Sequence, residues 1–301
     1  MRRLAITDDR FRRLSWVAVG ALSLIVLTGA LVRLTNSGLG CPTWPRCYGH
    51  VYPPLALHPL IEFGNRALSG LVGVITVAVF AAAWFVRPRR RGLIWLAAAL
   101  PGGVVAQAVL GGFTVREKLA PGFVMSHFLL SMVILVFAFW LAWRATYPIG
   151  ARPRSTDRAL VWSVRGLAVL ATITVFAGTA ATAAGPHSGG NLGQHIKRLT
   201  IEGPNTLEWA VHQHATVAAV FGVATILVWL LKRQRTGGAL DPLEPLTVLG
   251  VLLAAQGLLG SVQYELKLPG EMVWLHIVLA TGTWLVTLWA VAREGRIGEP
   301  R

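Results

Sequence analysis

The chain has 301 residues, of which 54% are hydrophobic and 14% are charged. Soluble globular domains rarely have so apolar a composition, so we interpret the chain as a polytopic membrane protein. Its formal net charge of +15 raises nucleic acid as a partner, but the basic residues cluster in alternate loops instead of forming one face. That distribution excludes a nucleic-acid-binding surface as the explanation of the charge.

Eight apolar runs are long enough to cross the hydrocarbon core of a bilayer, which takes about 20 residues of helix. They lie near residues 14–34, 61–86, 93–114, 122–146, 166–185, 208–231, 244–264 and 272–292. No small-residue cleavage site follows the first run, so we expect no removed signal peptide. The sequence therefore predicts an all-α integral membrane protein with eight transmembrane helices.

Basic residues indicate the orientation of these helices. Of the 28 Lys and Arg residues, 20 lie in the N-terminal segment, in the second, fourth and sixth loops, and in the C-terminal tail. Positive residues accumulate on the cytoplasmic side of membrane proteins, so we expect both termini in the cytoplasm. Two outward loops are long, residues 35–60 and 186–207, and each is expected to cover the outer face of its own half of the chain.

The sequence contains an imperfect internal repeat. One offset of 149 residues relates three pairs of positions: His127 and His276, Asn65 and His214, and Gly29 and Gly178. An even number of spans separates the members of each pair, so the two copies are oriented alike. We therefore predict a duplicated pair of four-helix bundles, residues 1–150 and 151–301.

Three histidines are predicted at similar depth, a turn or two inside the outward ends of their helices. An ionisable side chain within the bilayer needs a partner and indicates function, although a single histidine is as often only hydrogen-bonded. Neutral imidazole is an axial ligand of haem iron, so we predict that His214 and His276 bind one haem. In the first half His127 faces Asn65, a poor iron ligand, which leaves one face of a second haem open. His212 lies on another face of its helix and is expected to support His214.

The stretch IEFGNR places polar residues at the head of an apolar run. Glu62 precedes Asn65 by three residues, so the two share a helix face, with Glu62 nearer the outside. We predict that Glu62 faces the open side of the porphyrin, where a carboxylate can accept a proton or stabilise a developing cation. Arg66 is expected to pair with Glu62 or with a haem propionate. The alternative is a Glu–Arg pair that only orients the helix at the membrane interface.

Cys41 and Cys47 lie in the first outward loop, in the stretch GLGCPTWPRCYG. On the oxidising side of a bacterial membrane they can close a small disulfide. Two thiols with only His50 nearby form a weaker metal site. We expect the disulfide to staple a lid over the N-terminal haem site, and a redox role is the alternative.

Taken together, these residues resemble the bacterial haem A synthase family across essentially the whole chain. The matching segments are TGALVRLTNSGLGCPTWPRCYG, IEFGNR, GGFTVREKLAPGFVMSH, GPHSGG and VWLHIVLA. The resemblance implies a protein of the bacterial cytoplasmic membrane that oxidises the C8 methyl of haem O to the formyl group of haem A, with haem b as cofactor. It also implies successive hydroxylations through an alcohol and a gem-diol, with oxygen taken from water.

Carried over residue by residue, the resemblance assigns these roles: Glu62 as the essential carboxylate, His127 as the ligand of haem O, His214 and His276 as the ligands of haem b, and Cys41 with Cys47 as the outer disulfide. The chain departs from the family at Asn65, where the better-known members have histidine in a Glu-x-x-His-Arg pattern. His58 is another histidine close to this position, but it precedes a proline and lies nearer the water.

The implied partners are haem O, the haem O synthase that supplies it, and membrane lipid, and the chain is compatible with a homo-oligomer. Two other classes of protein fit part of the pattern. A di-haem b, quinone-linked electron-transfer cytochrome needs four strong axial ligands, and Asn65 breaks that set. A haem or small-molecule carrier would have broken helices at mid-membrane, whereas here the Gly and Pro features lie at helix ends.

Overall fold

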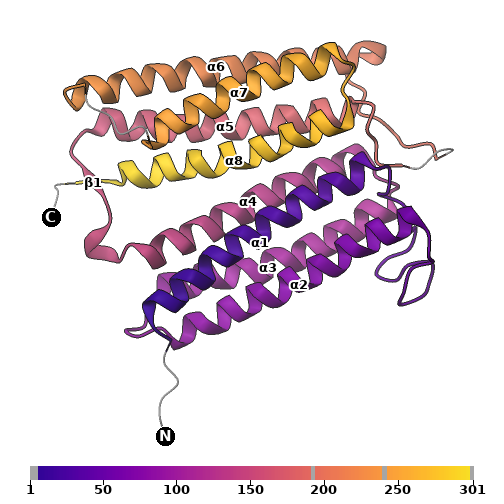
Figure 1. Cartoon of the computed structure of the whole chain (residues 1–301), viewed down its shortest axis with the longest axis horizontal. Coiled ribbons are helices and arrows are strands. Elements are labelled where there is room, and N and C mark those ends of the chain that lie inside the picture. The colour runs from indigo at the N-terminus through magenta and orange to yellow at the C-terminus, as the bar shows by residue number, and fades with distance from the viewer. Residues whose placement is uncertain (1–5, 191–193, 239–242, 299–301) are drawn as a thin grey trace, which may run out of the picture. The chain divides into compact units, whose positions relative to one another are not determined.

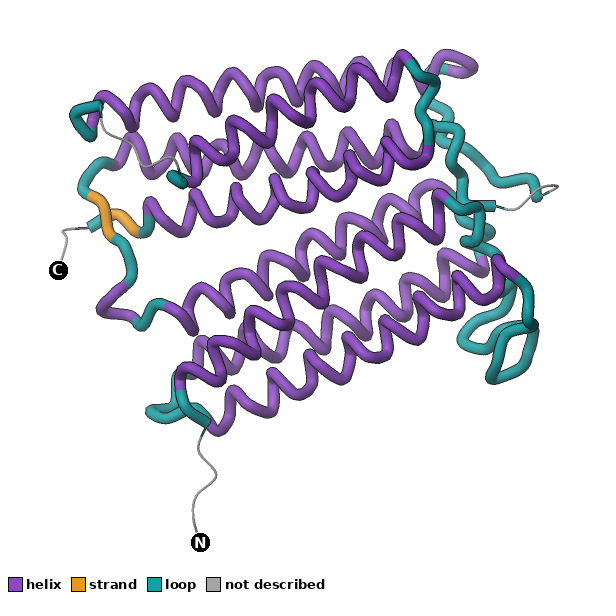
Figure 2. The backbone as a smooth tube through the Cα atoms, viewed as in Figure 1, coloured by secondary structure: helices purple, strands orange, loops and turns teal. Residues whose placement is uncertain are grey.

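The computed structural model describes residues 6–190, 194–238 and 243–298. Within these ranges, eight helices are long and apolar enough to cross a membrane, which confirms the predicted number of spans (Figures 1 and 2). They are α1 Asp8–Leu34, α2 Leu57–Phe85, α3 Arg91–Arg116, α4 Pro121–Thr146, α5 Arg158–Ala184, α6 Thr206–Arg235, α7 Pro245–Glu265 and α8 Gly270–Glu294. The short elements are η1 Ile149–Ala151, η2 Gly203–Asn205, β1 Arg154–Ser155 and β2 Arg296–Ile297.

Several helices extend beyond the apolar runs because polar residues cap their ends. α1 begins after Thr7, whose hydroxyl oxygen accepts the Arg10 N–H at 3.4 Å. α5 begins after Asp157, whose carboxylate accepts the Leu160 N–H at 3.0 Å. Such side chains satisfy N–H groups that lack a partner within the helix. Hydrophobicity therefore marks the spans, and capping residues determine where these two helices start.

The chain divides into two compact units. Unit 1 contains the described residues of Met1–Pro148 and Gly185–Leu199. In it α1 and α3 each pack against both α2 and α4, so the four helices form a closed ring. Leu100 of α3 and Leu135 of α4 are fully buried in the interior of this ring. At the end of the ring away from the first long loop, Trp16 Nε1 donates to Thr146 Oγ1 at 3.1 Å and ties α1 to α4.

Unit 2 contains the described residues of Ile149–Ala184 and Thr200–Arg301. Here α5 and α7 each pack against both α6 and α8, which gives the same ring order. Phe221 of α6 and Leu249 of α7 are buried in its interior. β1 and β2 pair in parallel, with Arg154 opposite Arg296.

The described residues of the segment Gly185–Leu199, which are 185–190 and 194–199, pack on unit 1, although the helices on either side of the segment belong to unit 2. Arg33 Nε donates to the His187 carbonyl at 2.7 Å, and the Gly38 N–H donates to the Gly189 carbonyl at 2.8 Å. One buried apolar cluster joins Leu39, Val115, Leu119 and Ile196. The prediction that the loop 186–207 covers its own half is therefore wrong for this segment, because its hydrogen-bond partners and its apolar contacts are in unit 1.

A buried ion triad holds together the end of unit 2 where α6 finishes. Lys232 Nζ lies 2.6 Å from Glu244 Oε1 and also pairs with Glu294 Oε1. The three side chains are only 12%, 8% and 9% exposed, respectively. The ammonium therefore compensates two carboxylates that come from the start of α7 and the end of α8.

We expect Lys232→Met to destabilise unit 2 by about 3–5 kcal/mol, because the change leaves two buried carboxylates without their cation. The triple change Lys232→Met, Glu244→Gln and Glu294→Gln removes the charges together and is expected to restore most of that loss. Thermal unfolding in detergent measures both variants. Equal destabilisation of the single and triple variants would contradict this role for the triad.

Candidate functional site

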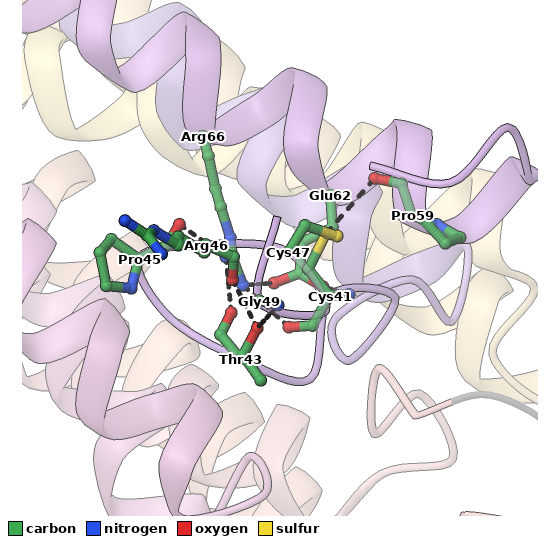
Figure 3. Close-up of a disulfide and its surroundings, with 9 residues drawn as sticks. All are labelled: Cys41, Thr43, Pro45, Arg46, Cys47, Gly49, Pro59, Glu62 and Arg66. Carbon is green, nitrogen blue, oxygen red and sulfur yellow. Dashed lines mark hydrogen bonds and ion pairs between the residues drawn. A yellow bond between two sulfur atoms is a disulfide. The ribbon is translucent and has the colours of Figure 1, made fainter. Parts of the chain in front are cut away.

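Glu62 is buried near the start of α2, and the loop between α1 and α2 closes over it. Its Oε2 atom accepts the Cys41 N–H at 2.7 Å, and its Oε1 atom pairs with Arg66 Nη2. The Glu62 side chain is only 7% exposed. Figure 3 shows both side chains reaching from α2 to the disulfide loop. A carboxylate can be buried in this way because a cation and a backbone donor compensate its lost hydration.

Arg66 binds the same loop through backbone carbonyls. Nη2 donates to the Cys41 carbonyl at 2.9 Å, and Nη1 donates to the carbonyls of Thr43 at 2.9 Å and Pro45 at 3.4 Å. Together with the Glu62 contact, both terminal nitrogens of the guanidinium are occupied. Of the two predicted partners of Arg66, the structure provides Glu62, and three loop carbonyls accept the other hydrogen bonds from Nη1 and Nη2.

The predicted disulfide is confirmed: Cys41 and Cys47 are bonded, and both residues are fully buried. Because both sulfurs are in this bond, the alternative of a thiolate metal site does not hold. The loop also lies tightly on the helices. A Cβ at Gly40 would lie 2.4 Å from the His58 carbonyl oxygen, and one at Gly112 of α3 would lie 3.0 Å from the Trp44 ring. The loop is thus a fitted cover over the start of α2.

We expect Arg66→Lys to loosen this cover, because an ammonium cannot reproduce the fork that binds Glu62 and three loop carbonyls. Hydrogen bonds to charged groups contribute about 1.5–3 kcal/mol, so we expect the buried disulfide to be reduced roughly tenfold faster by a water-soluble phosphine. Thiol labelling over time measures the rate. Arg46→Lys, at an exposed position of the same loop, is the control. Equal reduction rates in the two variants would contradict the proposal that Arg66 holds this loop in place.

Asn65 and His127 lie on α2 and α4, which are diagonal to each other in the ring of unit 1. Asn65 Oδ1 accepts a hydrogen bond from Thr28 Oγ1 of α1 at 2.8 Å, so the amide is tied to the helix wall. His127 Nδ1 is buried and has no hydrogen-bond partner among the described residues. In the interior of unit 1, His127 on α4 therefore faces the amide of Asn65 on the diagonal helix α2, where unit 2 would have a second imidazole.

His214 and His276 lie on the diagonal helices α6 and α8 of unit 2. Their ring centroids are 6.1 Å apart, with 69° between the ring planes. An iron held at about 2 Å by one nitrogen of each ring, with each ring centre roughly 1 Å behind its nitrogen, needs a separation of about 6 Å. His214 Nδ1 lies 3.1 Å from the Thr174 carbonyl oxygen, which leaves Nε2 as the nitrogen for a metal. The residues present therefore fit a bis-histidine haem.

Four glycines face Asn65 and the three interior histidines, and only two of these glycines, Gly29 and Gly178, were predicted from the sequence. If a Cβ is built at each glycine, the nearest side chain to it is Asn65 for Gly29, His127 for Gly111, His214 for Gly178 and His276 for Gly260. The offset of 149 residues also relates Gly111 to Gly260. That offset was the signal that could have found them.

Two glutamines were also missed. Gln107 Nε2 donates to the His127 carbonyl at 2.9 Å and to Ser131 Oγ at 2.7 Å. Gln256 is its equivalent at the same offset of 149 residues. The side-chain carbonyl oxygens of both glutamines are buried without a partner among the described residues.

Two other histidines do not join these sites. The His212 side chain is 72% exposed and lies 4.0 Å from Glu208 on the surface of α6. The expectation that it supports His214 is wrong, because a two-residue step rotates it to the outer face of the helix. His58 Nδ1 lies 3.0 Å from Ser37 Oγ at the start of α2, so the loop engages this ring.

The fold and these buried polar positions define a multi-pass membrane protein with histidines in the interior of its helix rings. Residues 12–188 match the family model of the cytochrome oxidase assembly proteins, COX15-CtaA. The match covers more than half of the chain, so the chain belongs to this family. It includes the disulfide loop, Glu62, Asn65, Arg66 and His127, whereas His214 and His276 lie outside it.

The chain is also similar to curated proteins named heme A synthase. It is 31% identical over 179 residues to that of Shewanella oneidensis, which is 51% of this chain and 49% of the relative. It is 29% identical over 175 residues to those of Bacillus cereus strain AH187 and Bacillus mycoides, with 56% of each chain covered. The chain thus spans about half the length of the curated relatives it matches. The predicted family resemblance is confirmed by these matches.

Proposed function

We propose that this protein is a haem A synthase that oxidises the C8 methyl of haem O to a formyl group. The observation that carries the proposal is the difference between the two rings. Unit 2 has two imidazoles spaced for one iron, whereas unit 1 has His127 and, at the other position, an amide three residues from the buried Glu62. One site then suits a cofactor, and the other suits a substrate with an accessible face.

In unit 2, His214 and His276 would hold haem b. Haem b held by these two imidazoles would supply one-electron transfer, because no coordination position would remain for a substrate. The protein orients at least one ligand: the contact of His214 Nδ1 with the Thr174 carbonyl fixes the ring and its tautomer.

In unit 1, His127 would bind the iron of haem O, and Glu62 would act at the opposite face. The Glu62 carboxylate accepts hydrogen bonds from Cys41 and Arg66. A carboxylate has about four acceptor positions, so some remain for water or substrate. In its ionised form, paired with Arg66, Glu62 can accept a proton from an attacking water or stabilise positive charge that develops on the substrate.

The overall change converts the methyl and one water to the formyl group, with release of four protons and with transfer of four electrons to an external electron acceptor. Two hydroxylations give first the alcohol and then the gem-diol, which loses water. We propose water as the oxygen source because Glu62 lies at the loop end of unit 1. The disulfide loop would limit solvent entry while its backbone holds the carboxylate.

We also propose the arrangement around this chemistry. The chain would lie in the bacterial cytoplasmic membrane with both termini in the cytoplasm, supported by the distribution of Lys and Arg. The two units would be copies of one ancestral four-helix bundle. This is supported by the offset of 149 residues, which relates the two pairs of glycine and facing side chain in unit 1 to the two pairs in unit 2. Haem O would come from a haem O synthase. A di-haem electron-transfer cytochrome would need a strong iron ligand at the position of Asn65. The amide there is a poor ligand and already accepts a hydrogen bond from Thr28, so this alternative has less support.

The direct test is haem extraction from protein expressed with a supply of haem O. We expect the unmodified protein to contain haem b and to accumulate haem A or its alcohol precursor. In Glu62→Gln, the amide keeps one acceptor for the Cys41 N–H but cannot accept a proton. Haem b should remain, and haem A formation should fall by at least about 100-fold, the lower range for loss of general base catalysis.

Glu208→Gln is the matched control, because Glu208 is an exposed carboxylate on α6 and should leave haem A formation unchanged. Haem A formation retained in Glu62→Gln would remove the carboxylate from the mechanism. Absence of haem O, its alcohol and haem A from the unmodified protein would reject the proposed function as a whole.

The assignment of the two rings has its own test. We expect His276→Met to perturb the low-spin haem b absorption spectrum more than His127→Met does, because only His276 shares an iron with a second imidazole. Low-temperature optical spectra of the two purified variants measure the difference. An unchanged low-spin spectrum in His276→Met would show that haem b is not bound in unit 2.

A further inference from the structure

The contact between His214 and Gly178 is the closest of the four glycine and ligand pairs. A Cβ built at Gly178 would lie 3.0 Å from His214 Cε1 and 3.3 Å from His214 Nδ1. The imidazole therefore lies directly against the backbone of α5, at a place where an alanine methyl would displace it. In the same position, Nδ1 is 3.1 Å from the carbonyl oxygen of Thr174, one turn before the glycine.

The other two histidines repeat this relation at slightly larger distances. A Cβ at Gly111 would lie 3.4 Å from His127 Cε1, and one at Gly260 would lie 3.4 Å from His276 Cε1. Their Nδ1 atoms would be 4.0 and 3.9 Å from the added carbon, respectively, and both are buried without a partner among the described residues. In each case the ring again lies against the helix that precedes its own.

The residue one turn before the glycine is a glutamine in both of these helices. Gln107 precedes Gly111 by four residues, and Gln256 precedes Gly260 by four. Their amide oxygens are buried without a partner among the described residues. His127 and His276 therefore each have a ring nitrogen without a partner. On the adjacent helix, the turn before the glycine carries a backbone carbonyl and a glutamine side-chain carbonyl that also lacks a partner.

We propose that Gly178, Gly111 and Gly260 are positioning residues that seat the three imidazoles against the neighbouring helix. The missing Cβ lets the ring approach the turn before the glycine. That turn accepts the Nδ1–H of His214 and carries the acceptors that we assign to the Nδ1–H of His127 and His276. The lone pair of Nε2 is then directed into the ring of helices. This inference rests on the proposed function, because it describes how the haem ligands of that function are oriented.

Gly29 supports this role by contrast. It occupies the equivalent place on α1, but a Cβ there would be 3.9 Å from Asn65 Nδ2, an ordinary van der Waals distance. The amide is shorter than an imidazole and is bonded to the Thr28 side chain instead of a backbone carbonyl. Steric exclusion of a Cβ is thus strongest at Gly178, weaker at Gly111 and Gly260, and absent at Gly29, which faces the amide.

The test uses the purified holoprotein and three alanine variants in unit 2. In Gly178→Ala the His214 ring must shift and lose its contact with Thr174. We expect about a tenfold or greater loss of haem b affinity, together with altered g-values in the electron paramagnetic resonance spectrum. Gly260→Ala, with its 3.4 Å contact, should retain haem b and show a smaller change of the same kind. Gly166→Ala is the control, because a Cβ there meets nothing within 4 Å on the same helix as Gly178.

Alanine forms helix more readily than glycine, so weaker helix formation does not explain an effect confined to Gly178 and Gly260. If Gly178→Ala loses haem b altogether, the g-values of Gly260→Ala decide the outcome. Unchanged haem b content and g-values in both variants would overturn the inference while the proposed function stands. Absence of haem b from the unmodified protein would instead overturn the proposed function.

Discussion

A charged or polar side chain inside a ring of apolar helices must find its partners within the protein, because lipid offers none. Glu62 meets this requirement through the disulfide loop, which contributes the Cys41 N–H and fixes Arg66 beside the carboxylate. The loop in turn needs the buried disulfide and the close contact of Gly40 with α2. Burial of one carboxylate thus explains why this long loop packs so tightly against the end of unit 1.

The same requirement separates the two units chemically. In unit 2 the polar side chains on α6 and α8 are imidazoles, and their 6.1 Å separation suits a shared metal. In unit 1 one of the two positions holds Asn65, whose amide is satisfied by Thr28. Because this amide oxygen already accepts a hydrogen bond from α1, it does not require a metal ion as a partner. The repeat therefore keeps the four positions, whereas the side chains differ: two imidazoles in unit 2, and one imidazole and one amide in unit 1.

Much of this could be predicted from the sequence. Apolar runs gave the eight spans, and the offset of 149 residues gave the paired polar positions, because both are periodic properties of the chain. The packing of Gly185–Leu199 on unit 1 could not be predicted, since it depends on Arg33 and Gly38 meeting backbone carbonyls distant in the sequence. Hydrophobicity likewise did not indicate that Arg66 binds loop carbonyls, or that His212 faces outward.

The central claim is that one ring holds a fully ligated iron and the other holds an iron with a vacant face beside Glu62. Electron paramagnetic resonance of the haem-loaded protein tests it most directly, because low-spin and high-spin ferric haem give separate signals. The account predicts one bis-histidine low-spin haem b and a second, high-spin haem whose signal disappears in His127→Ala. Two low-spin bis-histidine signals, or a preparation without any porphyrin, would contradict it.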